Sequence, residues 1–235
     1  MTKLVVVSAG LSVPSSTRLL GDRLAAATAA HTGAEVQVIE VRDLAVEIAH
    51  NLTSGFPGPA LAAALDAVTE ADGLIVVTPV FSASYSGLFK SFFDVLGARD
   101  QDALAGKPVL IAATGGTARH SLVLDHALRP LFAYLRAVVV PTGVYAASED
   151  WGAEGLPERV ERAAGELAAL LPTAAGRPVA ALPPEAAGRP GAAESPGAAE
   201  RPGAAERPAP PAARRAEPDG FTVVPFEEQL AALRG

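Results

Sequence analysis

The sequence predicts an α/β domain in which a five-stranded parallel sheet carries helices on both faces. Five strand-like runs alternate with five helical patterns along residues 1–171, which is the order of a doubly wound fold. Three of the strand-like runs are continuous Val, Ile and Leu stretches rather than alternating ones. Continuous apolar strands are buried on both faces, as they are in a parallel sheet between two helical layers.

The elements follow one another in a regular order along the chain. The expected strands are Lys3–Ser8, Glu35–Glu40, Gly73–Thr78, Pro108–Thr114 and Ala137–Pro141. The expected helices span residues 16–31, 58–71, 87–97, 120–135 and 156–171. Ser15 or Ser16 can cap the first helix and Gly33 can close it, while Gly106 and Pro108 interrupt the chain before the fourth strand.

Composition divides the chain into a globular part and an appendage. Of the 235 residues 49% are hydrophobic, which is ample for a core, yet residues 172–218 hold 11 of the 20 prolines. Residues 190–207 repeat a six-residue unit, Pro-Gly-Ala-Ala-Glu followed by Ser or Arg, three times. This unit has no large apolar side chain that could offset the entropy of ordering it. We therefore expect one domain over residues 1–171 and a disordered Pro/Ala/Gly/Glu/Arg tether over residues 172–218.

The last residues, 219–235, regain apolar side chains. Phe226, Leu230 and Leu233 recur at helical spacing, which indicates a short amphipathic helix. A helix of this length is marginal alone and needs a surface. We expect a C-terminal docking segment that binds either its own domain or a neighbouring subunit.

Charge and residue usage exclude several functions. The net charge is −7, and residues 1–171 hold 12 basic and 18 acidic residues, so the basic excess typical of nucleic-acid binding is missing. The chain has no cysteine, and its four histidines show no ligand spacing, so we expect no metal site. No hydrophobic run is long enough for a membrane span or a signal-peptide core, so a cytoplasmic protein is expected.

The first strand ends in a serine-rich turn, Ser8–Arg18, which leads into the first helix. Neither G-x-G-x-x-G nor the P-loop motif is present, and hydroxyls before a helix N-terminus suit a single terminal phosphate. The candidate phosphate ligands are Ser8, Ser15, Ser16 and Thr17. The alternative is a plain helix cap with a polar loop. Arg18 either adds charge to this site or is a solvated surface residue.

Two further loops follow the third and fourth strands. Residues 78–90 combine Pro79 with two aromatic residues and small hydroxyl residues, which suits one wall of a flat ring. Alternatively, Phe81 and Tyr85 pack beneath the sheet. In residues 114–121, a glycine pair allows close approach of the backbone to a ligand, although turns use such pairs widely. Arg119 and His120, at the start of the next helix, are either ligand contacts or ordinary surface and capping residues.

Together, these three loops resemble those of the NAD(P)H-dependent FMN reductase family, a flavodoxin-like group. The likeness covers most of residues 1–171, in order, and is strongest to reductases that accompany luciferase-like flavin monooxygenases. It is carried by residues 7–18, 78–90 and 115–122. The resemblance implies the flavodoxin-like strand order 2-1-3-4-5, with FMN and NAD(P)H as cofactors.

The resemblance also implies which residues bind the flavin. The phosphate end would be bound by Ser8, Gly10, Ser15, Ser16 and Thr17. The isoalloxazine would be flanked by Pro79, Val80, Phe81, Ser82, Ala83 and Ser84, and its other edge would be closed by Thr114, Gly115, Gly116, Arg119 and His120. The family's usual Pro-Glu-Tyr-Asn is replaced here by residues 79–82, and its Gly-Ser opening by residues 9–10. These departures shift flavin recognition from side chains toward the backbone.

The expected function is reduction of FMN by NAD(P)H, through hydride transfer to flavin N5. Arg119 and His120 are candidates for stabilising charge at the flavin N1/O2 edge. Reduced flavin would then reach an acceptor or a partner monooxygenase. The alternatives are an FMN-dependent quinone or azo reductase, a flavodoxin-type electron carrier, and a scaffold that has lost its cofactor.

The resemblance also implies a homodimer or a higher homo-oligomer. A subunit contact through Leu88, Phe89, Phe92 and Phe93 is one possibility, and packing of the same residues against the sheet is the other.

Overall fold

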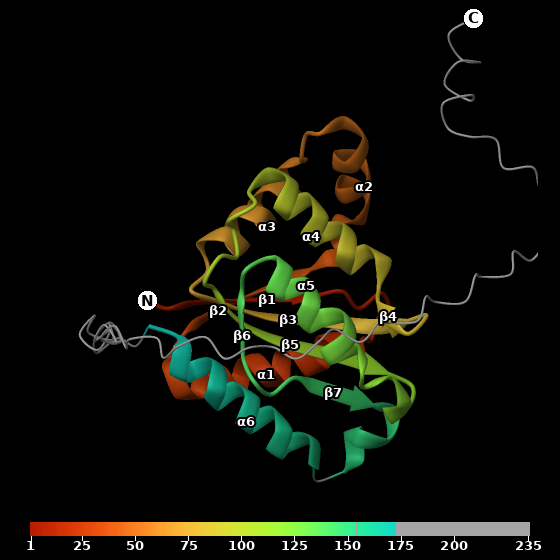
Figure 1. Ribbon diagram of the computed structural model, residues 1–235, viewed down its shortest axis with the longest axis vertical. Helices are drawn as coiled ribbons and strands as arrows, with labels where there is room; N and C mark the ends of the chain where they lie inside the picture. Colours follow the sequence, from red (N-terminus) through yellow and green to blue (C-terminus); the bar gives the residue numbers. More distant parts are fainter. Residues whose placement is uncertain (154, 173–235) are drawn as a thin grey trace, which may run out of the picture. The chain divides into compact units, whose positions relative to one another are not determined.

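Residues 1–153 and 155–172 are described by a computed structural model, and they form one parallel sheet in the order β2-β1-β3-β5-β6 (Figure 1). The parallel strands are β1 (Lys3–Ser8), β2 (Glu35–Glu40), β3 (Gly73–Phe81), β5 (Pro108–Gly115), β6 (Val138–Val139) and β7 (Val144–Ala147). A short strand, β4 (Ser84–Tyr85), pairs antiparallel with the end of β3. Counted over the parallel strands, this is the flavodoxin-like order 2-1-3-4-5, so the predicted fold class is confirmed.

The fifth strand differs from the prediction. Instead of one strand over Ala137–Pro141, two short pieces, β6 and β7, both pair in parallel with β5. Pro141 lies between them, and a proline has no N–H to donate to a sheet ladder. Pairing therefore stops before the proline and resumes at Val144, which carries the chain further toward the carboxyl edge of the sheet.

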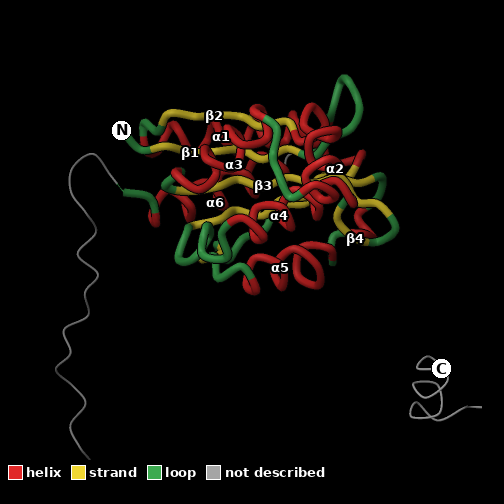
Figure 2. The backbone as a smooth tube through the Cα atoms, turned by 90° about the horizontal axis from the view of Figure 1, so that it is seen from above, coloured by secondary structure: helices red, strands yellow, loops and turns green. Residues whose placement is uncertain are grey.

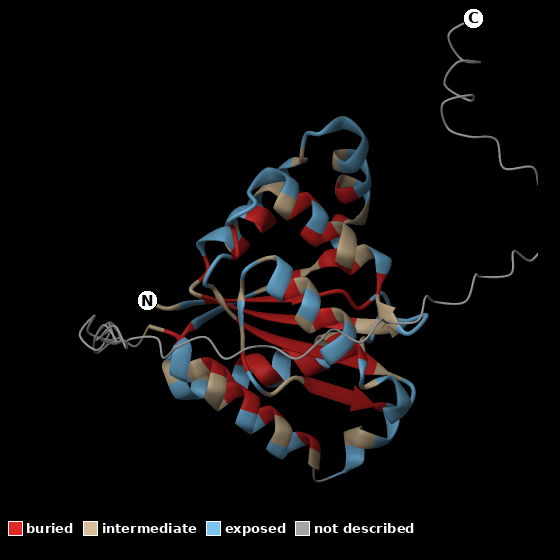
Figure 3. Ribbon diagram, viewed as in Figure 1, coloured by how far each residue is buried: buried red, intermediate tan, exposed pale blue. Residues whose placement is uncertain are grey.

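Helices cover both faces of the sheet, which separates two apolar cores (Figure 1). Alternate residues of β1 enter opposite cores, with Val5 and Val7 on one side and Leu4 and Val6 on the other. The first core lies under α2 (Ala45–Ser54), α3 (Pro59–Glu70), α4 (Gly87–Arg99) and α5 (Arg129–Tyr134), and the second under α1 (Ser16–Thr32) and α6 (Gly155–Leu170). Figure 2 shows β2, β1 and β3 side by side from above, and Figure 3 shows the central strands buried. Burial of the strands on both faces confirms the inference from their continuous apolar runs.

Two helical regions depart from the prediction. Helix α2 was not predicted, and in the structure Ile48 is its one buried residue. The helix expected over residues 120–135 is broken into a 3₁₀ turn, η2 (Ala118–His120), a π-helical turn, η3 (Leu124–Leu128), and α5. Pro130 near the start of α5 cannot donate a helical hydrogen bond, and the regular α-helix begins only around this residue.

The phenylalanines of α4 lie inside the domain. Phe89, Phe92 and Phe93 are buried, while Leu88 is half-buried at the edge of the same core. The ring centroid of Phe93 lies 4.8 Å from that of Phe89 and 5.0 Å from that of Phe132 on α5. Of the two alternatives for these side chains, packing in the domain's own core is therefore the one that the structure shows.

The predicted tether over residues 172–218 lies outside the described residues except for Pro172, and so does the predicted docking segment over residues 219–235. The Pro172 carbonyl accepts a hydrogen bond of 2.6 Å from the Thr2 hydroxyl, beside the start of β1. None of the helices in the described ranges has the length and apolar character needed to cross a membrane.

Candidate functional site

A cleft of about 600 Å³ lies at the carboxyl ends of the parallel strands. Its walls come from the loop after β1 and the first turn of α1, from the end of β3, from the end of β5 with Gly116, and from a 3₁₀ turn, η4 (Ser148–Gly152), that follows β7. The lining residues are Leu11, Ser12, Ser16, Thr17, Pro79, Val80, Phe81, Thr114, Gly115, Gly116, Ser148 and Trp151. A second hollow of about 460 Å³ lies at the opposite ends of β1 and β2 and has a charged rim. We place the site in the first cleft, because open α/β sheets bind ligands at the carboxyl ends of their strands.

One end of the cleft is formed by the N-terminus of α1. The Ser15 side chain caps this helix by accepting a hydrogen bond of 3.2 Å from the Arg18 N–H. Ser16 and Thr17, in the first turn, line the cleft, and the first turn carries no acidic residue. Helix N-terminal N–H groups and hydroxyls are therefore directed at this end without a competing negative charge, an arrangement that binds anions.

Two of the predicted residues between β1 and α1, Ser8 and Gly10, do not line the cleft. Ser8 is buried at the end of β1, and its hydroxyl has no hydrogen-bond partner among the described residues. Gly10 is also buried, and a Cβ at this position would lie 2.0 Å from the Ser15 hydroxyl and 3.0 Å from the Thr17 Cβ. The chain therefore folds back closely on itself here, in a way that only glycine permits.

The first and third loops are joined at the floor of the cleft. The Thr17 and Thr114 hydroxyls are buried and lie 2.8 Å apart, within hydrogen-bond distance. This contact links residues 97 positions apart in the chain, on α1 and β5. A buried pair of this kind fixes the distance between the anion-binding end and the glycine loop.

The second loop is a tight hairpin between β3 and β4. Ser82 and Ala83 form its turn with φ angles of 49° and 64°, values that favour glycine and belong to two-residue hairpin turns. Pro79, Val80 and Phe81 line the cleft, whereas Ser82, Ala83 and Ser84 lie beyond the lining. Phe81 is 49% exposed, so it stands at the cleft and not beneath the sheet, while Tyr85 packs against the core.

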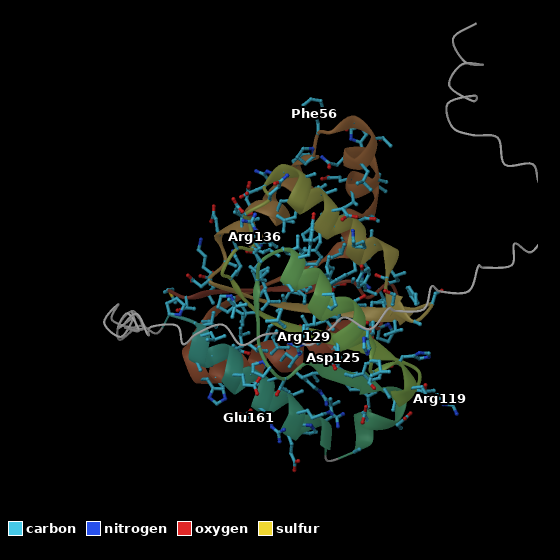
Figure 4. The ribbon with its side chains drawn as sticks, in the orientation of Figure 1. Phe56, Arg119, Asp125, Arg129, Arg136 and Glu161 are labelled. Carbon is cyan, nitrogen blue, oxygen red and sulfur yellow. The ribbon has the colours of Figure 1, made fainter. Side chains whose placement is uncertain are left out.

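The third loop brings its two glycines to the cleft. Gly115 and Gly116 line it, but Arg119 and His120 do not, because η2 carries them as exposed residues beyond the glycine pair. Figure 4 shows Arg119 pointing away from the ribbon at this edge of the domain. Of the sixteen residues predicted to bind the cofactor, Ser16, Thr17, Pro79, Val80, Phe81, Thr114, Gly115 and Gly116 are thus brought together as lining residues.

The fourth wall of the cleft, supplied by η4, was not predicted from the sequence. Ser148 and Trp151 line the cleft, and the Arg23 guanidinium of α1 lies 5.1 Å from the centre of the Trp151 ring, a cation–π distance. The available signal was the position of the chain's one tryptophan shortly after the last strand, at the carboxyl edge of the sheet. It was missed because the last strand was expected to end at Pro141. The residues that follow β7 were therefore not expected at the carboxyl edge of the sheet.

Asp150 holds η4 in position. Its carboxylate accepts a hydrogen bond of 2.8 Å from the Ala147 N–H and forms an ion pair of 3.0 Å with Arg159. Burial alone would raise the pKa of Asp150, but the Ala147 hydrogen bond and Arg159 outweigh it, and the pKa lies below its ordinary value. The ionised carboxylate therefore stabilises the turn that carries Trp151.

We expect Asp150→Asn to lower the free energy of unfolding by about 1 kcal/mol, comparable to the loss of a helix cap. Because the pKa of Asp150 is lower in the folded chain than in the unfolded one, its ionised carboxylate stabilises the fold fully above the unfolded pKa, at about pH 4. This stabilisation is lost as the pH falls through the pKa of the folded state. Trp151 emission, recorded against pH, should show this acid transition in the native chain and not in the variant. An identical acid transition in both proteins would contradict the assignment.

Among residues 1–153 and 155–172, those that line the cleft include no ionisable side chain. Arg18, the nearest candidate in sequence, has its guanidinium engaged by Asp22 at 2.7 Å and by Glu40 at 2.5 Å. The hydrogen bond to Asp22 and the contact with Glu40 raise the pKa of Arg18 above its ordinary value against the opposing effect of burial. Arg18 is therefore neither a cleft residue nor a freely solvated one, and the hydrogen-bond donors among the lining residues are neutral.

The chain is similar in sequence and fold to several known proteins. The sequence profile described as "NADPH-dependent FMN reductase" matches residues 2–152. The chain is 42% identical to the "FMN reductase (NADPH)" of Pseudomonas aeruginosa, over 72% of this chain and 91% of the relative. It is 43% identical to the "NADH-dependent FMN reductase SfnE" of Pseudomonas putida, over 74% and 89%. A crystal structure of an oxidoreductase from Corynebacterium diphtheriae is 50% identical and covers 73% of this chain and 97% of its own, with a TM-score of 0.70.

The profile match spans all three predicted loops and also reaches η4. The chain thus belongs to the NADPH-dependent FMN reductase family, a group of flavin reductases that work with FMN and NAD(P)H.

Proposed function

We propose that this chain reduces FMN by direct hydride transfer from NAD(P)H, with the flavin held in the cleft between β1, β3 and β5. The phosphate would lie at the N-terminus of α1, against Ser16 and Thr17, and the ring between Pro79–Phe81 and Gly115–Gly116. The observation that carries this proposal is that three loops far apart in the sequence line one cleft inside the region matched by the family profile.

The residues present fit such a ligand. The Ser8 hydroxyl, buried at the end of β1 behind the cleft lining, has no hydrogen-bond partner among the described residues, so it is free to donate if a bound phosphate reaches it. Gly10 keeps the turn before α1 close-packed, and at Gly115 a Cβ would lie 2.1 Å from the Tyr145 hydroxyl. Both glycines therefore allow close packing of the backbone against the protein's own side chains, which fixes the two loops on either side of the cleft.

The bound flavin would supply the hydride acceptor, at N5, so the protein needs no nucleophile of its own. Its own residues position the reactants and exclude water, with Phe81 and Trp151 as apolar walls of the cleft. Arg119 and His120 follow Gly116 by three and four residues and are exposed outside the cleft lining, so we assign them no role at the N1/O2 edge. The two relatives compared above differ in nucleotide, and we propose no preference between NADPH and NADH.

We further propose that reduced FMN leaves the cleft and serves a separate flavin-dependent monooxygenase in the cytoplasm. A cleft without ionisable residues holds the phosphate by dipoles and hydroxyls, which favours exchange over permanent retention. We also propose a homo-oligomer. Phe56, 76% exposed beyond α2 and seen in Figure 4 at the outer end of that helical layer, is one position at which a subunit contact can be tested.

The single tryptophan makes the proposal directly testable. Because Trp151 lines the cleft, FMN should quench most of the chain's tryptophan fluorescence, with a Kd on the order of micromolar. Riboflavin, which lacks the phosphate, should bind about tenfold more weakly. NAD(P)H oxidation should require added FMN.

Two results would contradict the proposal. One is a lack of quenching at saturating FMN together with no FMN-dependent NAD(P)H oxidation. The other is a tightly held flavin that passes electrons to quinones much faster than free FMN is reduced, which would make the chain a quinone reductase.

A further inference from the structure

Two side chains outside the cleft support its opposite ends. We propose that Arg42 and Tyr145 are positioning residues, which fix the phosphate end and the ring end of the flavin site independently of each other. Neither residue lines the cleft. The inference rests on the proposed function, since it assigns the two ends of the cleft to the two ends of FMN.

Arg42 acts on the loop before α1. It lies in η1 (Val41–Leu44), the 3₁₀ turn after β2, and its Nη1 donates a hydrogen bond of 2.7 Å to the Ser12 carbonyl. Ser12 lines the cleft, and its hydroxyl donates in turn to the Pro14 carbonyl within the same loop. Arg42, which does not itself line the cleft, therefore contacts the backbone of the loop between β1 and α1, where we place the phosphate.

Glu40 anchors Arg42 to the sheet. Its carboxylate, at the end of β2, forms ion pairs with both Arg42 and Arg18. Glu40 is the register partner of Ser8 on β1, and its side chain is only 16% exposed. The guanidinium of Arg42 thus spans from a fixed carboxylate to the loop carbonyl, which a lysine ammonium, without the planar fork, cannot reproduce.

Tyr145 acts on the glycine loop at the other end. It lies on β7 opposite Ala113 of β5, and its hydroxyl donates a hydrogen bond of 2.8 Å to the Thr117 carbonyl. In the described part of the chain, no other side chain forms a hydrogen bond with residues 115–121. Burial, aided by Glu149 and Asp150, raises the pKa of Tyr145, so the phenol keeps its proton and stays a donor at neutral pH.

The two supports should have separable effects on binding. A loop released from its support populates additional conformations. The apparent affinity for the ligand then falls in proportion to the fraction of molecules that still hold the binding-competent conformation. Without Arg42 the disturbed loop is the phosphate loop, so FMN binding weakens while riboflavin binding is nearly unchanged. Without the Tyr145 hydroxyl the disturbed loop faces the ring, so both ligands lose affinity by the same factor.

The experiment is a titration of Arg42→Met, Arg42→Lys and Tyr145→Phe with FMN and with riboflavin, followed by Trp151 fluorescence. For Arg42→Met, we expect the FMN Kd to rise about tenfold and the riboflavin Kd to change less than about twofold. Arg42→Lys should recover part of this loss. For Tyr145→Phe, which keeps the buried ring, we expect both Kd values to rise about fivefold.

Matched controls separate these effects from general loosening of the fold. Arg129→Met removes an ion pair of 3.2 Å with Asp125, labelled beside it in Figure 4, and hydrogen bonds to the Val140 and Pro141 carbonyls. None of these residues lines the cleft. Tyr134→Phe removes a phenol that is 84% exposed. Both controls should leave both Kd values unchanged, even if the Arg129 variant melts at a lower temperature.

The FMN-to-riboflavin ratio decides the outcome. The inference is overturned if Arg42→Met weakens both ligands equally or neither, or if Tyr145→Phe changes the ratio or changes nothing. Native chain that binds neither flavin would instead refute the proposed function, so the two failures are distinguishable.

Discussion

Gly10→Ala is expected to weaken FMN binding about 100-fold, the combined effect of an overpacked turn and a lost helix cap. The new Cβ would lie 2.0 Å from the Ser15 hydroxyl and 3.1 Å from the Ser15 Cβ, so rotation of Ser15 relieves only part of the clash. If Ser15 moves, the Arg18 N–H loses its cap, and the N-terminus of α1 shifts away from the phosphate. Titration with FMN through Trp151 fluorescence measures the loss.

Gly97→Ala is the matched control for this prediction. Gly97 lies on α4, and a Cβ there would meet only the Leu135 Cδ2, at 3.9 Å, which is an ordinary contact. This variant should bind FMN with native affinity and be as stable as the native chain or more so. Native affinity in Gly10→Ala would show that the phosphate does not depend on the turn before α1, and the placement of FMN would have to be abandoned.

Phe93→Ala is expected to lower the free energy of unfolding by about 3–5 kcal/mol. Phe93 is 1% exposed and contacts the rings of Phe89, Phe92 and Phe132, so truncation leaves a cavity between α4 and α5. Denaturant unfolding followed by circular dichroism measures the change. If the alanine variant does not fold, Phe93→Leu gives a smaller loss, of about 1 kcal/mol, for the same reason.

The test for Phe93 also separates the domain core from a subunit contact. A core defect lowers stability equally at all protein concentrations, whereas an interface defect lowers it most in dilute protein and shifts the sedimentation coefficient. Phe56→Ala, at an exposed site, should leave the stability of the single subunit within about 0.5 kcal/mol. A Phe93→Ala variant of native stability that dissociates into smaller species would place this ring in an interface.

Local sequence patterns were sufficient for most of the fold. The Val-rich strands and the capped helix at Ser16–Thr32 are dictated by short-range chemistry, and four of the five expected strands start at the residues where the structure starts them. The fifth strand, the π-helical turn and α2 were not predictable in the same way. Pro141 interrupts the fifth strand and Pro130 interrupts the fifth helix, and where each element resumes depends on the elements packed against it. In α2, Ile48 is the one buried residue.

The site was predictable where it follows a strand directly. Thr17, Pro79 and Gly115 come within ten residues of the end of a strand or within the strand itself, and the parallel sheet brings such positions to one edge. Trp151 was missed because its place depends on where the chain goes after a broken strand. The roles of Arg42 and Tyr145 were also hidden, because a hydrogen bond to a distant backbone carbonyl leaves no local pattern.

From the amino-acid order alone came the doubly wound domain, the three loops at the strand ends and the likeness to FMN reductases, because periodicity and capping act between near neighbours. The tertiary structure alone decided that Arg18 pairs with Glu40 instead of entering the cleft, that Arg119 stands at the rim, and that the α4 phenylalanines face inward. Each of these depends on which partner residue, often dozens of positions away, arrives within a few ångströms once the chain has packed.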